Sequence, residues 1–255
     1  MNVALSPYNQ IYTDQKTILC FLHIPKTGGT TINYLLKSAL GSRVLFNESL
    51  LHACGGDAAM DGFLRGHPQF YEGVRAIVGH YGVDHALVRQ APRAVLLAGV
   101  MRPSLPRIIA LYEYIRCRPD HPEHAALRDL SLYQALARVP TFAAHCSNAQ
   151  LRTLFGAIDP PGVAAALRRY PYLLGQMAHL EAFAARLLAA CGVRLVGQVP
   201  RLNERQEAPG FMPASTQPDF PAAMARLQVL NAAEIAFMAR LPPLVAFRPR
   251  DAVPI

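Results

Sequence analysis

Three apolar runs along the chain lack helical spacing, and each is followed by glycine or proline before a helical pattern begins. They cover residues 18–22, 75–78 and 94–101, and the third is apolar throughout. Runs of this kind are typical of strands that are covered on both faces of a parallel sheet. A further short strand is expected at 43–46. The repeated alternation of strand, loop and helix predicts an α/β fold in which helices flank a central parallel sheet.

The second half of the chain is expected to be mostly helical. A helix beginning at residue 103 or 104 is predicted by apolar positions that share one face, namely Ile108, Leu111, Tyr112 and Ile115. Ser131 and Gln134 have the spacing of a capping box. Helices are predicted at 83–90, 131–138, 147–154, 162–169, 177–190 and 221–240, with a last short strand at 193–196. The glycine-containing residues 47–73 are expected to form an irregular connection with one helical turn.

The composition describes one globular domain over residues 1–255, with 1–16 as a loosely held N-terminal segment. Apolar residues make up 52% of the chain and charged residues 16%, which excludes a disordered protein. The N-terminus lacks the pattern of a signal peptide, and no run of about 18 apolar residues occurs. We therefore expect a soluble, cytoplasmic protein without an integral membrane segment.

Lysine and arginine outnumber the acidic residues by 25 to 17, which gives a formal net charge of +8. A positive field suits either a nucleic-acid binder or an enzyme whose ligands are anionic. No zinc-finger or RNP motif is present, so we expect no nucleic-acid partner. Five widely spaced cysteines without a C-x-x-C pair indicate reduced thiols. A proline separates His121 from His124 and nothing completes a ligand shell, so no metal is expected.

The most informative stretch is 17–36, where an apolar run breaks into a glycine loop and resumes as a helix. Gly28 and Gly29 let the backbone approach a ligand closely, and Thr30 or Thr31 suits the N-cap position. The free amides in the first turn of that helix attract an anion. The stretch is therefore expected to bind a phosphate or sulfate group.

Lys26 adds a mobile positive charge to this loop, and hydroxyl donors come from Thr27, Thr30 and Thr31. The loop differs from a Walker A motif, which places its lysine after the last glycine and directly before Ser or Thr. Here Lys26 precedes both glycines. A P-loop kinase, which would bind ATP with magnesium, is therefore disfavoured.

The order His-Ile-Pro-Lys-Thr-Gly-Gly-Thr-Thr at 23–31 closely resembles the 5′-phosphosulfate loop of one sulfotransferase group. These enzymes use 3′-phosphoadenosine 5′-phosphosulfate (PAPS), and the group contains the heparan and chondroitin 2-O-sulfotransferases. The resemblance implies a P-loop-like three-layer fold. It also implies transfer of a sulfuryl group from PAPS, without a metal, to a hydroxyl of a glycan or glycoconjugate.

The same resemblance assigns roles within the loop. Lys26 is expected to be catalytic, close to the leaving oxygen. The residues expected to bind PAPS here are Lys26, Thr27, Gly28, Gly29, Thr30 and Thr31. Related animal Golgi enzymes carry a membrane anchor, so the resemblance implies a bacterial-type cytoplasmic form or a trimmed one.

Arg102 begins the stretch Arg-Pro-Ser-Leu-Pro-Arg-Ile-Ile-Ala-Leu-Tyr. It resembles the family's 3′-phosphate motif, which has Arg-Asp-Pro, then Arg, Ser and Tyr, and Arg102, Arg107 and Tyr112 match it. The chain departs from the motif where Pro-Ser replaces Asp-Pro and where Ala110 replaces the serine. The resemblance implies that the Arg102 guanidinium grips the 3′-phosphate. Loss of the serine hydroxyl would weaken donor binding by roughly 1 kcal/mol, and Arg107 is expected to be a structural ion-pair partner.

His80, in Gly-His-Tyr-Gly, occupies the place of the family's Gly-His element, whose histidine is the proposed general base. A histidine is suited to this task because it titrates near neutral pH. The resemblance therefore implies that His80 is catalytic, although a second family histidine is Val78 here. Without the resemblance, His80 would be interpreted as structural. His85 is the alternative base.

Weaker resemblance extends over about residues 18–240. Residues 148–152 resemble the family's Asn-x-Gln-Thr-Arg, 174–181 resemble Val-Gly-Leu-Thr-Glu, and Leu202-Asn203 resembles a late loop near the cofactor. The substitution at Ala110 leaves an alternative open, in which the chain is a degenerate, non-catalytic binder of nucleotides or polyanions.

Overall fold

The structure, a computed structural model, describes residues 17–200, 202 and 212–248. These residues form a six-stranded sheet in the order β2-β3-β1-β4-β5-β6, in which β6 alone runs antiparallel to its neighbour. The strands are β1 (Ile18–Leu22), β2 (Val44–Phe46), β3 (Ala76–Gly79), β4 (Val95–Met101), β5 (Tyr172–Gln176) and β6 (Leu244–Phe247). The predicted α/β class with helices around a mainly parallel sheet is confirmed. The expectations for 1–16 and Asn203 lie outside the described residues.

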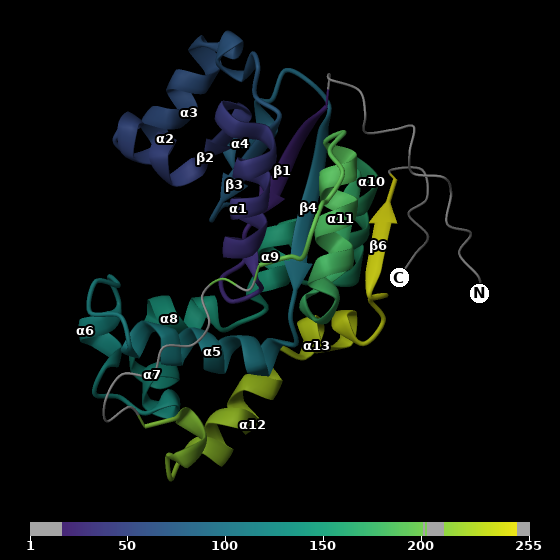
Figure 1. Cartoon of the computed structure of the whole chain (residues 1–255). Coiled ribbons are helices and arrows are strands. Elements are labelled where there is room, and N and C mark those ends of the chain that lie inside the picture. The colour runs from purple at the N-terminus through teal and green to yellow at the C-terminus, as the bar shows by residue number, and fades with distance from the viewer. Residues whose placement is uncertain (1–16, 201, 203–211, 249–255) are drawn as a thin grey trace.

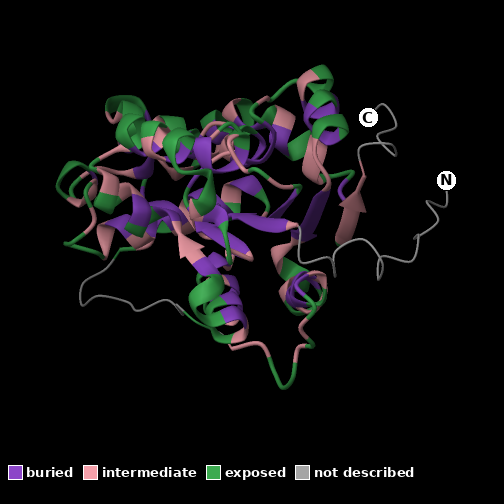
Figure 2. Ribbon diagram, turned by 90° about the horizontal axis from the view of Figure 1, so that it is seen from above, coloured by how far each residue is buried: buried purple, intermediate pink, exposed green. Residues whose placement is uncertain are grey.

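Alternate side chains of the central strand β1 enter two different hydrophobic cores, one on each face of the sheet. Cys20 belongs to the first core and Phe21 to the second, and both are fully buried. The first face is covered by α3 (Asp57–Gly66), α4 (Ala86–Arg89), α9 (Ala149–Phe155) and α10 (Pro160–Arg169), and the second by α1 (Gly29–Leu40) and α11 (Leu180–Ala190). Figure 2 shows the buried strands between helices whose outer surfaces are exposed. Burial on both faces explains the uninterrupted apolar run.

A third core lies in a helical lobe beyond the carboxyl ends of the parallel strands (Figure 1). The helices that build it are α5 (Ser104–Arg116), α7 (Leu132–Arg138), α8 (Pro140–His145) and α12 (Phe220–Leu230). The predicted apolar face of α5 is buried in this core. The predicted capping box of Ser131 and Gln134 begins α7. The short helix α6 (His124–Leu127) lies between α5 and α7 along the chain.

The connections that leave the central strands β1 and β4 run in opposite directions. The chain passes from β1 through α1 to β2 on one side, and from β4 through the helical lobe to β5 on the other. In parallel sheets, such a reversal leaves a crevice at the carboxyl ends of the two strands, where ligands bind. The loops that follow Leu22 and Met101 meet at this crevice.

Residues 47–73 contain more helix than the sequence analysis predicted. They form α2 (Asn47–Cys54), α3 and the 3-10 turn Pro68–Tyr71. Gly55 has a φ of 79°, and its N–H donates to the carbonyls of Leu51 and His52. This left-handed glycine therefore terminates α2 and allows the chain to start α3. The glycines that suggested an irregular connection act here as helix ends.

The strand predicted at 193–196 is wrong. This segment has no regular structure, and Val196 is 86% exposed. The sheet is instead extended beyond β4 by β5 and β6, neither of which was predicted. Both are only four or five residues long, so their strand character depends on pairing with neighbours.

The single helix predicted at 221–240 is two helices, because Asn231 separates α12 from α13 (Ala232–Met238). Asn231 is fully buried, and its Nδ2 donates to the carbonyls of Cys146 and Leu227 while its Oδ1 accepts from the N–H of Asn148. These bonds hold the C-terminal helices against the segment before α9. Tertiary hydrogen bonding thus overrides the continuous helical pattern.

Glu234 of α13 is fully buried and accepts hydrogen bonds from the Ser104 hydroxyl and from both the backbone and the side chain of Gln150. Gln150 in turn clamps the backbone of Arg102, accepting from its N–H at 2.9 Å and donating to its carbonyl at 2.8 Å. The network therefore joins α13, α9 and the end of β4.

We expect the substitution Glu234→Ala to lower the free energy of unfolding by about 3 kcal/mol, because it leaves three buried donors without an acceptor. Urea denaturation of the full chain measures this. Glu72→Ala removes an exposed carboxylate and is the control, with an expected change within about 0.5 kcal/mol. Equal stability of the two variants would contradict the importance of the network.

Candidate functional site

The loop between β1 and α1 folds sharply at the carboxyl end of the central strand. Lys26 and Gly28 have φ angles of 67° and 87°, both in the left-handed region. Gly29 has an ordinary φ, but a Cβ there would lie 1.8 Å from Cδ2 of His23. The left-handed backbone thus favours glycine at position 28, and the packed ring of His23 requires it at position 29.

The N-terminus of α1 faces a cleft, and Gly28, Gly29 and Thr30 line it. The amides of Thr31 and Ile32 donate back to the carbonyl of Gly28. The first amides of a helix have no partner within that helix, and they carry the positive end of its dipole. This end of α1 is therefore suited to an anion.

The three threonines of the loop have different environments. The buried hydroxyl of Thr27 donates to the carbonyl of Ile24 at 2.9 Å, and that of Thr31 donates to the carbonyl of Pro200 at 3.2 Å. These two hydroxyls are committed to the fold, and the amide of Thr31 donates to the carbonyl of Gly28, so of these two residues it is Thr27 whose amide can contribute to an anion site. Thr30 is exposed and lines the cleft.

Lys26 extends along the cleft, where its Nζ lies 4.1 Å from the ring centroid of Tyr114. The Arg118 guanidinium approaches the same ring at 5.5 Å. Burial, together with the nearby charges of Arg102 and Arg118, lowers the pKa of the Lys26 ammonium. Among the described residues, no carboxylate forms an ion pair with Lys26 or Arg102. The cleft thus gathers positive charge that an anionic ligand would neutralise.

Arg102 is the residue that links β4 to this loop. Its Nη1 donates to the carbonyl of Lys26 at 3.3 Å, while Gln150 holds its backbone. Arg102 is partly buried and lines the cleft. The two cations, which follow different strands, therefore lie in one cleft, at the sheet edge where the order of the elements leads us to expect them.

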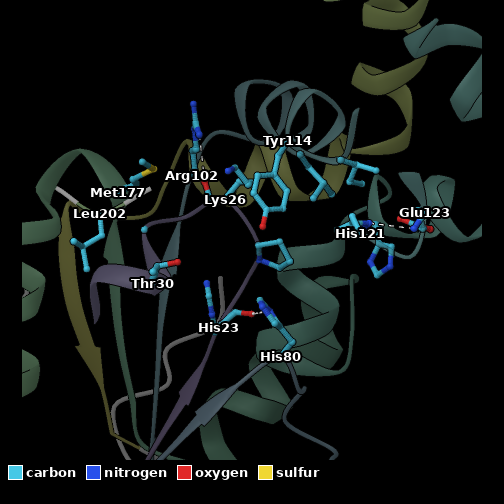
Figure 3. Close-up of a pocket in the computed structure, with 16 residues that line it drawn as sticks. His23, Lys26, Thr30, His80, Arg102, Tyr114, His121, Glu123, Met177 and Leu202 are labelled. Atoms are coloured by element: carbon cyan, nitrogen blue, oxygen red, sulfur yellow. Dashed lines mark hydrogen bonds between the residues drawn. The ribbon is translucent and has the colours of Figure 1, made fainter. Parts of the chain in front are cut away.

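His80 follows β3 and lies against His23, with ring centroids 4.2 Å apart (Figure 3). Its Nδ1 is 2.8 Å from the carbonyl oxygen of His23, and its N–H donates to Oε1 of Glu48. A carbonyl only accepts hydrogen bonds, so the proton of neutral His80 resides on Nδ1. Nε2 then carries a lone pair, which is the state that a general base requires.

His23 is 9% exposed, and burial followed by the nearby His80 lowers its pKa to about 3. The side chain is therefore neutral at physiological pH. The sequence analysis did not assign it a role, although it stands directly before the Ile-Pro-Lys of the loop motif. Its function in the fold is to support the ring of His80 and to fill the space over Gly29.

The cleft has a volume of about 390 Å³ and lies between the strand ends and the helical lobe. Figure 3 shows Thr30, Met177 and Leu202 on one side of it and His121 and Glu123 on the other. Tyr114 stands between these sides, with its hydroxyl directed toward the histidine pair. The lobe contributes Leu111, Tyr114, Ile115, His121, Glu123 and His145.

Several residues singled out from the sequence lie away from the cleft. Arg107 is fully buried and donates to the carbonyl of His145 at 2.9 Å, so it is structural, although no ion pair with a described residue was found. The Tyr112 hydroxyl donates to the carbonyl of Leu130. His85 caps α4 and contacts Asp57. These side chains are committed to packing.

Neither the known protein-family models nor the curated proteins provide a match to this chain. In the part of the chain that the structure describes, no helix has the length and apolar character needed to cross a membrane. The described residues also contain no group of three or more His, Cys, Asp or Glu arranged to hold a metal ion.

We expect acid to destabilise the fold through His23. The unfolded chain protonates this residue near pH 6.5, whereas the folded chain keeps it neutral down to a pKa of about 3. Between these values the unfolded state binds more protons, so stability falls as the pH drops below 6.5, by up to about 1.4 kcal/mol per pH unit.

The substitution His23→Phe keeps an aromatic ring but removes the titration. Between pH 6.5 and pH 5, the wild-type chain is expected to lose about 2 kcal/mol more stability than the variant. Urea denaturation at both pH values measures the difference. Parallel losses in the two proteins would show that His23 does not remain neutral in the folded state.

Proposed function

We propose that the protein is a sulfotransferase that moves a sulfuryl group from PAPS to a hydroxyl of a glycan or glycoconjugate. The observation that carries the proposal is the convergence of three groups in one cleft. These are the N-terminus of α1, the cations of Lys26 and Arg102, which form no ion pair with a described carboxylate, and the Nε2 atom of His80. The resemblance of the loop sequence to the phosphosulfate loop of these enzymes supports the same assignment.

The strand–loop–helix unit of β1 and α1 would act as a P-loop-like anion site. The amides of residues 27–30 would hold the 5′-phosphosulfate, since that of Thr31 donates to the carbonyl of Gly28, and Arg102 would bind the 3′-phosphate. Lys26 would release the ring of Tyr114 and approach the oxygen that bridges phosphorus and sulfur. The apolar side chains of Met177 and Leu202 offer a surface for the purine.

In the proposed reaction, the acceptor oxygen attacks sulfur while the bond from sulfur to the bridging oxygen breaks. Nε2 of His80 takes the hydroxyl proton, and the products are a sulfate ester and adenosine 3′,5′-bisphosphate. Negative charge grows on the bridging oxygen as it leaves. Lys26 and the amides of α1 would stabilise this charge, as cations and amides do in phosphoryl transfer.

The alternative is a non-catalytic nucleotide or polyanion binder, and Ala110 is the observation that favours it. The family's serine hydroxyl is missing at this position, and the nearby Ser104 cannot replace it because its hydroxyl donates to Glu234. Adenosine 3′,5′-bisphosphate should raise the melting temperature under both proposals. Transfer of labelled sulfate from PAPS to a saccharide acceptor separates them, because only the enzyme performs it.

The substitution Lys26→Ala should reduce the transfer rate about 10²–10³-fold, because a charge that stabilises the leaving oxygen is lost. It should also weaken binding of adenosine 3′,5′-bisphosphate by about tenfold or more, as measured by titration calorimetry. Alanine and lysine both carry a Cβ, so the left-handed φ at this position is about equally unfavourable for both, and the substitution should leave the backbone unchanged. Lys37→Ala, on the exposed side of α1, is the control. Normal turnover by the Lys26 variant would refute its catalytic role.

The substitution His80→Asn tests the base while preserving the local hydrogen bond. The Asn amide nitrogen can replace Nδ1 as the donor to the His23 carbonyl, but no basic atom replaces Nε2. We expect the transfer rate to fall about 10²–10⁴-fold. Nucleotide binding and melting temperature should remain close to the wild-type values. An active Asn variant would exclude His80 as the base.

A further inference from the structure

The two walls of the cleft differ in charge. The wall formed by the strand ends presents Lys26 and Arg102, whereas the lobe wall presents Glu123, the one carboxylate among the described lining residues. His121 lies beside this carboxylate (Figure 3), and His145 and the aliphatic side chains of Leu111 and Ile115 also line the cleft. The lobe wall therefore favours a positively charged group, whereas the wall formed by the strand ends favours an anion.

Glu123 is held firmly in place by its backbone. Its N–H donates to Nδ1 of His121 at 3.2 Å, and its carbonyl accepts from the N–H of Leu127 at 3.1 Å. The ring of His124, next in the chain, donates to the carbonyl of Ile115 at 3.0 Å. These bonds tie the loop to the end of α5.

The Oε1 atom of Glu123 is buried and has no hydrogen-bond partner among the described residues. Burial of a carboxylate oxygen without a donor is unfavourable, so a ligand in the cleft gains affinity if it brings a donor that the Glu123 carboxylate can turn to meet. The neighbouring side chains do not neutralise the charge. Arg118 is paired with Asp120 through two hydrogen bonds of 3.0 Å.

His121 is also not a cationic partner for Glu123. Burial lowers the pKa of His121, although the nearby carboxylates of Glu123 and Asp120 act in the opposite direction. Its Nδ1 accepts a hydrogen bond, so the neutral ring carries its proton on Nε2. This wall therefore offers one negative charge and one neutral N–H donor.

PAPS, the sulfuryl donor, would bind to the positively charged wall formed by the strand ends. A phosphate monoester alone carries about −1.5 to −2 charges near neutral pH, and PAPS has a phosphosulfate in addition. Lys26 and Arg102 would both be engaged by these groups. A polyanionic acceptor would then find no free cation among the described lining residues, and Glu123 would repel it.

On the basis of the sulfotransferase activity proposed above, we infer that the acceptor is a hydroxyl compound bearing a protonated amine, such as an amino sugar. The ammonium binds Glu123, and the reacting hydroxyl lies at Nε2 of His80. Leu111, Ile115 and Tyr114 contact the carbon skeleton between the two groups. Polyanionic glycans, which the related 2-O-sulfotransferases act on, are excluded as preferred substrates.

The test compares three methyl glycosides: glucosamine with a free amine, its N-acetylated form and glucuronic acid. With labelled PAPS and the full chain, kcat/KM for the amine is expected to exceed that for the N-acetylated form at least tenfold. The glucuronide should be the poorest acceptor. Equal or faster turnover of the glucuronide would overturn the inference.

The substitution Glu123→Gln should abolish the preference for the amine by raising its KM tenfold or more, with little change for the N-acetylated glycoside. Asp129→Asn, an exposed carboxylate of the same lobe, is the control and should keep the preference. Melting temperatures verify that both variants fold. A Glu123 variant that retains the preference would refute the assignment.

The inference and the proposed function can fail separately. Stabilisation by adenosine 3′,5′-bisphosphate and transfer of label to any acceptor test the function, whichever acceptor is preferred. If no glycoside is sulfated, calorimetry with the nucleotide present still measures binding of the amine glycoside to the wild type and to Glu123→Gln. Tighter binding to the wild type supports the subsite, and equal binding excludes it.

Discussion

The geometry of the cleft depends on the buried carboxylate of Glu234. This side chain fixes Gln150, Gln150 clamps the backbone of Arg102, and Arg102 donates to the carbonyl of Lys26. The chain of bonds runs from the C-terminal helix α13 through the fully buried Gln150 of α9 to the loop after β1. Buried polar groups have few other hydrogen-bond partners in a dry interior. The network therefore fixes the end of β4 relative to the loop that follows β1. The helical second half is therefore part of the site's construction.

The same arrangement concentrates positive charge before any ligand arrives. Lys26 and Arg102 face a common cleft, and the ring of Tyr114 is the contact that the structure provides for the Lys26 ammonium. Burial and like-charge repulsion both act against the ammonium, as the lowered pKa of Lys26 indicates. An anion relieves both effects. Arg102 is held in place by Gln150, so it needs little reorganisation when an anion binds, whereas Lys26 has to leave the Tyr114 ring.

The elements that the sequence predicted well are those whose pattern is local. The apolar run of β1 and its glycine loop predict a strand, a sharp turn and a helix without reference to the rest of the chain. Tertiary contacts determine the features that were missed. Asn231 breaks a continuous helical pattern through bonds to distant residues, and His23 gains its role from a ring 57 positions away. The hydroxyls of Thr27 and Thr31 cannot be distinguished from that of Thr30 by type, because only the folded backbone decides which one reaches the cleft.

His23 acts on His80 in two ways. Its carbonyl fixes the proton on Nδ1 of His80, and its neutral ring packs against the His80 ring. The carbonyl of His23 accepts the Nδ1 proton of His80 whether or not Nε2 is protonated, so proton transfer would require no change of ring orientation. Meanwhile the His23 ring, kept neutral by burial, supports His80 without placing a second charge beside it. A protonated His23 would oppose the formation of a second imidazolium at 4.2 Å. The low pKa of His23 therefore favours the role as a base that we propose for His80.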